Sequence, residues 1–311
     1  MFPCATVLTS RFTGYGTIGD TGMFGGGQSS SSTRTDTVDL ISFDSGGAAT
    51  SHGTLLQENW RLDVGSDGDN CMFVAGHTAS GTSDQREMKK FSTTATSVAH
   101  GVLSLARYRP SASSNGSDVM VGGGFGSGTI FDVCDMNSFT STATGTSHGA
   151  LSIGRFRLAA GSNGAEVIFG GGEDVSGNTG YCDKKLFSST ATATAHGNLS
   201  VVRRNAAGGS DGFQMMFVGG LTGSNSKSDI VDMKSFATTA NAVSHGVLAV
   251  ARGRLAATSN SEFVMVGGGI DPSSATDLVD LVAFASNTTA TTHGTLSTAR
   301  HNLAGASGFA N

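Results

Sequence analysis

Short apolar segments alternate with glycine-rich turns along the chain, and the whole pattern recurs with a fixed period. A His-Gly step marks each recurrence, and successive steps stand 48 or 49 residues apart. The six steps begin at His52, His100, His148, His196, His245 and His293. Self-similarity at such a period indicates a repeat architecture. The repeat, more than the length of 311 residues, therefore determines the expected domain organisation.

Each repeat opens with a hairpin. A small-apolar strand follows the His-Gly step and ends at a turn such as Ser162-Asn163-Gly164. Asn-Gly and Asp-Gly turns supply the positive φ angles that two-residue hairpin loops need. An antiparallel second strand is therefore expected, for example Val167-Ile168-Phe169, and a glycine cluster ends it. The loop after the glycines differs in sequence from repeat to repeat.

The second half of each repeat predicts two more strands. The third strand alternates apolar and polar residues, as in 230–236, which is typical of a β-strand. A Thr/Ala-rich fourth strand leads to the next His-Gly step. Four short strands per repeat predict a propeller blade. The third strand carries a recurring acid and is followed by a recurring aromatic, which is Phe43, Phe91, Phe139, Phe187, Phe236 or Phe284.

The two ends of the chain decide the number of blades. The C-terminal stretch stops about where a second strand should begin, and Gly22-Met23-Phe24-Gly25 can supply that strand. Pairing both ends in one blade removes open sheet edges. We therefore predict one all-β domain over 1–311, a propeller with six blades closed by N- and C-terminal strands. The alternative is an incomplete seventh blade, with Arg11 to Thr17 as its first strand. The predicted blades are 52–99, 100–147, 148–195, 196–244, 245–292, and a composite of 293–311 with 1–51.

Composition narrows the functional classes. The net charge is −5 and no basic run occurs, which argues against a nucleic-acid partner. No apolar run approaches the roughly 20 residues of a membrane span, and the N-terminus lacks the features of a signal peptide. We expect no membrane insertion. The cysteines show neither CxxC nor zinc spacing and are expected to be free core thiols; they are Cys4, Cys71, Cys134 and Cys182.

The recurring polar residues are expected to be architectural. Equivalent positions of a propeller lie on a ring, whereas metal ligands must converge on one ion at roughly 2.0–2.2 Å. We expect each repeated histidine to bond backbone in an inter-blade turn, where the glycine permits positive φ. The recurring arginine and acid are expected to pair between strands. The glycine clusters precede no helix, so they indicate close packing and not a phosphate site. We expect no catalytic residue, no metal and no cofactor.

The loops after the glycine clusters carry the individuality of the chain. Variation mapped to one face is where repeat proteins usually bind; the alternative is that these loops are solvated connectors. Trp60, the only tryptophan, departs from the repeat and is expected either at an interface or as a cap on one blade. The candidate binding residues are His77, Phe125, Tyr181, Leu221 and Asp271.

The order of arginine, small-apolar strand, turn, apolar strand, Gly-Gly, variable loop, acidic strand and aromatic resembles the kelch repeat over essentially the whole chain. Phenylalanine stands where kelch repeats usually carry tryptophan, and the preceding tyrosine is missing. The run from Gly246 to Gly269 is also similar to kelch-like proteins of tailed, particularly marine, bacteriophages. Those proteins usually have an acidic run where this chain has His-Gly.

The resemblance implies a non-enzymatic structural or attachment protein of a virus particle, such as a tail, fibre or capsid-associated component. Its partners would be other virion proteins or copies of itself, with a host surface glycan or protein as a possible receptor. It would be made in the host cytoplasm without a signal peptide and end in the virion. A soluble glycan- or protein-binding propeller is the alternative, and a propeller enzyme is the third hypothesis.

Overall fold

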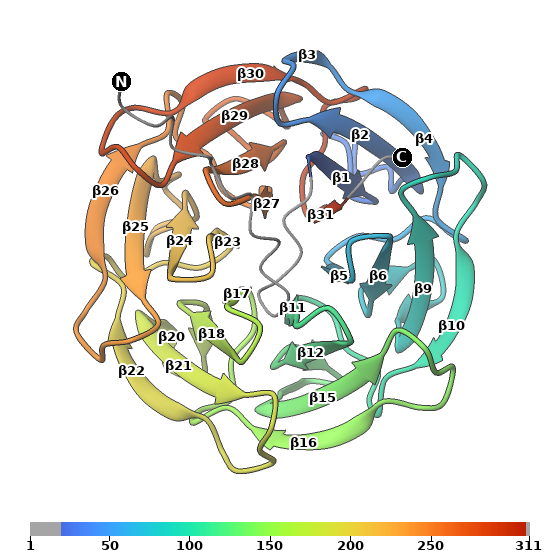
Figure 1. The fold of residues 1–311 in the computed structure, drawn as a ribbon, viewed down its shortest axis with the longest axis vertical. Helices are drawn as coiled ribbons and strands as arrows, with labels where there is room; N and C mark the ends of the chain where they lie inside the picture. The colour runs from blue at the N-terminus through green and yellow to red at the C-terminus, as the bar shows by residue number, and fades with distance from the viewer. Residues whose placement is uncertain (1–19, 309–311) are drawn as a thin grey trace, which may run out of the picture.

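Six four-stranded antiparallel sheets surround a central axis in the computed structural model, which describes residues 20–308 (Figure 1). The chain is an all-β, six-bladed propeller. In each blade the first strand lies nearest the axis and the fourth lies at the rim. Blades 2 to 6 consist, from the axis outward, of β5 (Asp63–Ser66), β6 (Asn70–Val74), β9 (Gln85–Lys90) and β10 (Val98–Val102); β11 (Ser111–Ser114), β12 (Asp118–Gly122), β15 (Val133–Ser138) and β16 (Thr146–Ala150); β17 (Ala159–Ser162), β18 (Glu166–Gly170), β21 (Tyr181–Leu186) and β22 (Thr194–Asn198); β23 (Ala207–Ser210), β24 (Gln214–Val218), β25 (Ile230–Ser235) and β26 (Val243–Val247); and β27 (Ala256–Ser259), β28 (Phe263–Gly267), β29 (Leu278–Ala283) and β30 (Thr291–Thr295).

Blade 1 closes the ring with strands from both ends of the chain. Its order is β31 (Ala304–Gly308), β1 (Thr21–Gly25), β2 (Thr37–Ser42) and β4 (Thr50–Thr54). All five residues of β31 pair with β1, so the predicted closure is confirmed and the seven-blade alternative is wrong. A short segment, β3 (Gly47–Ala48), adds a parallel contact to β30 of blade 6. The residues proposed for an extra strand, 11–17, lie outside the described residues.

The hairpin turns agree with the sequence pattern. In blade 3 the backbone N–H of Asn115 donates to the carbonyl of Asp118, which leaves a two-residue loop. Gly116 supplies the positive φ there. The Asn115 side chain accepts hydrogen bonds from the N–H groups of Ser117 and Asp118. Turn chemistry therefore sets the register of the two inner strands.

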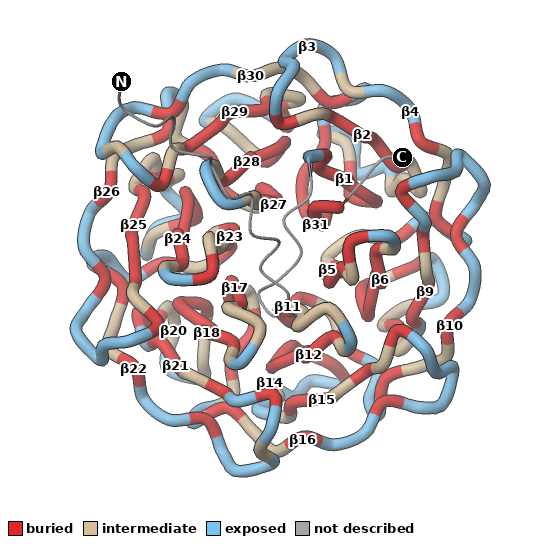
Figure 2. The backbone as a smooth tube through the Cα atoms, viewed as in Figure 1, coloured by how far each residue is buried: buried red, intermediate tan, exposed pale blue. Residues whose placement is uncertain are grey.

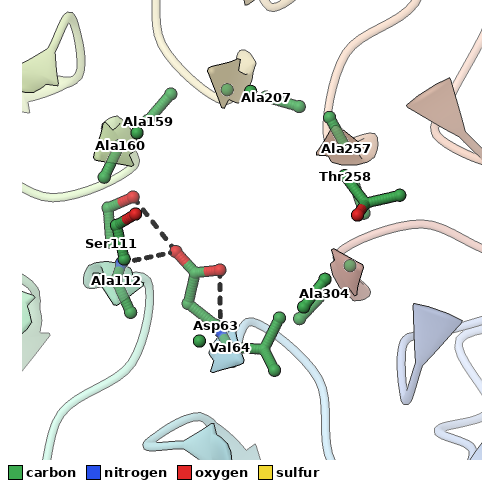
Figure 3. A pocket seen from close by; sticks show the side chains of 18 of the residues that line it. Asp63, Val64, Ser111, Ala112, Ala159, Ala160, Ala207, Ala257, Thr258 and Ala304 are labelled. Atoms are coloured by element: carbon green, nitrogen blue, oxygen red, sulfur yellow. Dashed lines mark hydrogen bonds between the residues drawn. The ribbon is translucent and has the colours of Figure 1, made fainter. Parts of the chain in front are cut away.

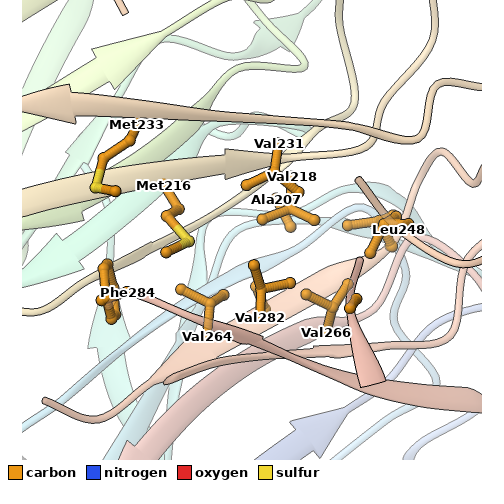
Figure 4. Close-up of a cluster of buried hydrophobic side chains, with 13 residues drawn as sticks. Ala207, Met216, Val218, Val231, Met233, Leu248, Val264, Val266, Val282 and Phe284 are labelled. Atoms are coloured by element: carbon orange, nitrogen blue, oxygen red, sulfur yellow. The ribbon is translucent and has the colours of Figure 1, made fainter. Parts of the chain in front are cut away.

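The hydrophobic core is divided into six wedges, one between each pair of neighbouring blades. Between blades 5 and 6, Met216 and Met233 face Val264, Val282 and Phe284 (Figure 4). All six recurring phenylalanines are buried in such wedges. Burial is concentrated in the inner strands, and the rim strands are largely exposed (Figure 2).

The third strands are more buried than their alternating pattern suggests. In β25, Val231 to Lys234 are all buried, because a blade in the ring is covered on both faces by its neighbours. The polar members bond within the fold, and the ammonium of Lys234 donates to the carbonyl of Thr238. No helix in residues 20–308 is long and apolar enough to cross a membrane.

Candidate functional site

The repeated histidines link neighbouring blades through the backbone. Each lies in a rim strand, not in a turn, and its Nε2 donates to a carbonyl at the end of the third strand of the next blade, at 2.7–3.1 Å. The glycine after it forms a β-bulge at positive φ in five blades. Gly294 is the exception, because β3 runs beside it there. The donors are His52, His100, His148, His196, His245 and His293.

Buried ion pairs hold five of the blades together internally. An arginine before the first strand bonds an aspartate of the third strand at 2.5–3.0 Å, with both side chains almost fully buried. The pairs are Arg107–Asp135, Arg155–Asp183, Arg203–Asp232, Arg252–Asp280 and Arg300–Asp39. Blade 2 has Asn59 and Glu87 at these places. Burial raises the pKa of Glu87, which accepts from the Leu56 N–H and the Ser97 hydroxyl.

A closed ring of backbone hydrogen bonds encircles the axis on the side of the variable loops. Two residues beyond each framework position, one residue per blade donates its N–H to the carbonyl of its counterpart in the preceding blade, at 2.7–3.0 Å. All six hold positive φ angles of 52–62°, which non-glycine residues seldom adopt. We call these residues the axial ring; they are Arg61, Arg109, Arg157, Asn205, Arg254 and Asn302.

The arginines of the axial ring are largely unpaired. Arg157 bonds Glu173 at 2.6 Å. Within residues 20–308, the side chains of Arg61, Arg109 and Arg254 form no ion pair and donate no hydrogen bond, and their Nε atoms are buried without a partner. Burial, and then the charges of Arg157, Arg61 and Arg254, lower the pKa of Arg109 far below the usual guanidinium value. The cluster is therefore positive and self-repelling.

Aromatic side chains follow half of this ring as a continuous arc. The successive ring centroids from Trp60 through His77, Tyr108 and Phe125 to Phe156 are 6.1, 5.7, 5.5 and 5.4 Å apart. Each blade here pairs the residue before the axial ring with the first loop residue, as Tyr108 pairs with Phe125. We call these five residues the aromatic arc. It lies in blades 2 to 4, which makes the mouth asymmetric.

Two cavities meet at this mouth. The axial cavity, of about 190 Å³, is lined by the inner strands of all six blades and by the axial ring (Figure 3). A second cavity, of about 460 Å³, opens between the loops of blades 1 and 6. We call it the serine-lined pocket; it includes Gln28, Ser30, Ser32, Trp60, Ser273 and His301. Arg61 and Arg254 line both cavities, so they stand where the two join.

One residue breaks the small-residue lining of the axial cavity. Asp63 occupies a place where four other blades have alanine. Its carboxylate accepts from the Ser111 hydroxyl at 3.0 Å and the Ala112 N–H at 2.8 Å (Figure 3). Burial raises the pKa of Asp63 to about 6, against the opposing effect of these hydrogen bonds.

The candidate loop residues lie in different environments. His77 and Phe125 belong to the aromatic arc. Leu221 is buried and pairs with Arg204 beside the ring. Tyr181 is 47% exposed at the start of β21, outside the arc. Asp271 accepts from the N–H groups of its own turn, which lower its pKa, next to the serine-lined pocket.

Sequence reasoning missed the axial ring. The signal was present as a second arginine two residues after the framework arginine, in Arg107-x-Arg109 and Arg155-x-Arg157. Trp60 was noticed, but its neighbours Tyr108 and Phe156 stand at equivalent positions and were not joined to it. The arc appears only when loops and strand starts of three blades are brought together in space.

Other candidate chemistry is sparse. Cys71, Cys134 and Cys182 are buried free thiols, as predicted, and Cys4 lies outside the described residues. No three His, Cys, Asp or Glu side chains of residues 20–308 form a possible metal site. Guanidinium groups are poor proton-transfer groups because they stay protonated. The convergent charges at the axis therefore favour binding over acid–base catalysis.

Comparison with models of known protein families gives no match, and comparison with curated proteins gives none either. The shared features of this chain with other proteins are thus those of its fold. Geometry and side-chain chemistry at the loop-side mouth carry the functional argument.

Proposed function

We propose that this chain is a non-enzymatic attachment protein, a rigid propeller that binds a carbohydrate at the loop-side mouth of its axis. The observation that carries the proposal is the aromatic arc. Trp60, His77, Tyr108 and Phe125 are half-buried, so each ring is held by its neighbours while part of it stays accessible. Binding sites combine such apolar surfaces with a few placed polar groups.

The adjoining serine-lined pocket supplies the polar part. Its volume falls within the usual range of ligand pockets, roughly 300–1,000 Å³. Hydroxyl and amide groups of Ser32, Ser273 and Gln28 line it beside Trp60, and such groups match the hydroxyls of a sugar. The loops that form it are tied together, because the Ala275 N–H donates to the Ser30 hydroxyl. A tied pocket reduces the ordering cost of binding.

We also propose that the chain acts as a structural or attachment component of a virus particle, with other virion proteins or copies of itself as partners. This part rests on the likeness of the repeats, including the run 246–269, to kelch-like proteins of tailed bacteriophages. The carbohydrate site gives such a component a surface for a host glycan. A soluble carbohydrate-binding propeller is the alternative setting for the same site.

A glycan array with the purified chain tests the proposal. We expect a defined subset of glycans to bind, and Trp60→Ala to abolish the signal. Phe213→Ala is the matched control, because Phe213 is 66% exposed in the β23–β24 hairpin at the opposite end of the axis. Binding that survives Trp60→Ala, or no binding to any glycan, would contradict the proposal.

A further inference from the structure

The loop-side mouth concentrates positive charge in a protein whose net charge is −5. Arg157 and Arg204 share a single carboxylate, that of Glu173. Arg61, Arg109 and Arg254 have none within the described chain. Buried like charges without partners are costly, so their clustering requires a reason other than stability.

The backbone of the axial ring does not require arginine. Asn205 and Asn302 hold the same positive φ and make the same N–H to carbonyl bond as the four arginines. Asparagine is also among the residues that tolerate this conformation best. Four of the six blades therefore carry a side chain that their own geometry does not call for, and strained positions with unexplained side chains indicate function.

The placement of these arginines indicates a ligand that reaches both cavities. Arg61 and Arg254 line the axial cavity and the serine-lined pocket alike. The guanidinium of Arg61 also lies over the Trp60 ring, 3.5 Å from its centroid, which fixes the charge against the aromatic surface. Planar guanidinium forks match carboxylate, sulfate and phosphate groups. Asp63 lies on the wall of the axial cavity, which disfavours an anion deeper in the channel.

We propose that the ligand is an acidic carbohydrate whose anionic group binds between Arg61, Arg109 and Arg254, while its sugar ring lies in the serine-lined pocket beside Trp60. The inference rests on the proposed function for the carbohydrate and on the axial ring for the charge. A compact cluster at one mouth, with hydroxyl-lined walls, fits a single acidic sugar better than a nucleic-acid strand, which needs a basic track along its backbone.

The test compares matched variants on matched ligands. Arg61→Asn and Arg254→Asn install the residue that two blades already carry at this position, so the fold is retained. Arg204→Asn is the control, because it removes one charge from the same face but its guanidinium already bonds Asn178 and Asn225. Binding of inorganic sulfate is measured by calorimetry and by the fluorescence of Trp60. Binding to arrayed glycans is measured for uronic-acid, sulfated and neutral sugars.

We expect acidic glycans to bind and their neutral counterparts to bind far more weakly. Arg61→Asn and Arg254→Asn should each weaken acidic-glycan and sulfate binding roughly ten- to hundredfold, the usual effect of losing a charged hydrogen bond. Arg204→Asn should weaken it by less than about threefold.

The other outcomes separate the two proposals. Trp60-dependent binding of neutral and acidic glycans with equal strength would overturn this inference and leave the proposed function in place. Sulfate binding that depends on Arg61 and Arg254, with no glycan bound, would overturn the proposed function and keep only the anion site. Competition by an acidic peptide or single-stranded RNA, without glycan binding, would overturn the carbohydrate class itself.

Discussion

Two sets of residues recur around the axis, and the blades agree on one far more strictly than on the other. The framework set consists of the histidine that bonds the next blade and the buried arginine–aspartate pair. It is complete in five blades and altered only in blade 2, where Asn59 and Glu87 replace the pair. The mouth set consists of the axial ring and the aromatic arc. Its backbone is the same in all six blades, but its side chains differ.

The difference follows from what each side chain contacts. A framework side chain bonds fixed groups inside the fold, so a change leaves a buried group without a partner. A mouth side chain extends from a backbone that is already satisfied by its own ring of hydrogen bonds. The mouth can therefore change its chemistry while the propeller stays the same, which is the property expected of a binding face.

Two arginines in one segment break this comparison most directly. Arg155 is fully buried and bonds Asp183 at 2.7 Å, whereas Arg157 is partly exposed and bonds Glu173. We expect Arg155→Ala to lower the free energy of unfolding by roughly 3–5 kcal/mol, because Asp183 is left buried and unpaired. Arg157→Ala should cost at most about 1 kcal/mol. Urea unfolding measures both, and equal losses would refute the distinction between framework and mouth.

The wall of the axial cavity offers a test that depends on pH. The pKa of Asp63 rises from 3.8 in the unfolded chain to about 6 in the folded protein. Between these values the unfolded state ionises first, so stability falls as the pH rises and the loss is complete above about pH 6. Asp63→Asn removes this loss. The variant should gain on the wild type between pH 4 and 7, by at most about 3 kcal/mol.

Thermal unfolding of both proteins across that range measures the effect. The difference between variant and wild type is the informative quantity, since other groups titrate equally in both. A difference that stays constant with pH would mean that the Asp63 carboxylate ionises in the folded state as it does in the unfolded chain.

The framework was predictable because its signals are local and periodic. The spacing of His100 and His148, the Asn-Gly turns and the strand patterns lie within one repeat, and the blade closure followed from what each end lacked. The mouth was not predictable to the same degree. The contact between Tyr108 and Phe125 joins a strand start to a loop, and the cluster of Arg61 and Arg254 joins blades at opposite ends of the chain. Such long-range neighbours leave no periodic trace.

A smaller effect is expected from the links between blades. His196 is almost fully buried, and its Nε2 donates to the carbonyl of Ser235 at 2.9 Å. His196→Ala should lower the free energy of unfolding by roughly 1–3 kcal/mol, because that carbonyl loses its partner. Glycan binding at the mouth should not change. A variant that loses binding while keeping its stability would assign the histidine to the mouth set instead.

The smallest expected effect on stability is at Arg254. Its side chain has no ion pair within the described residues, and it stands among like charges at a positive φ of 58°. Arg254→Asn removes that repulsion and installs a residue suited to the conformation. The urea midpoint should therefore stay the same or rise slightly, even though binding of the acidic ligand weakens. A marked fall in the midpoint would show that the guanidinium supports the ring itself, and the mouth would then belong with the framework. An unchanged midpoint together with lost binding separates the two sets at a single residue.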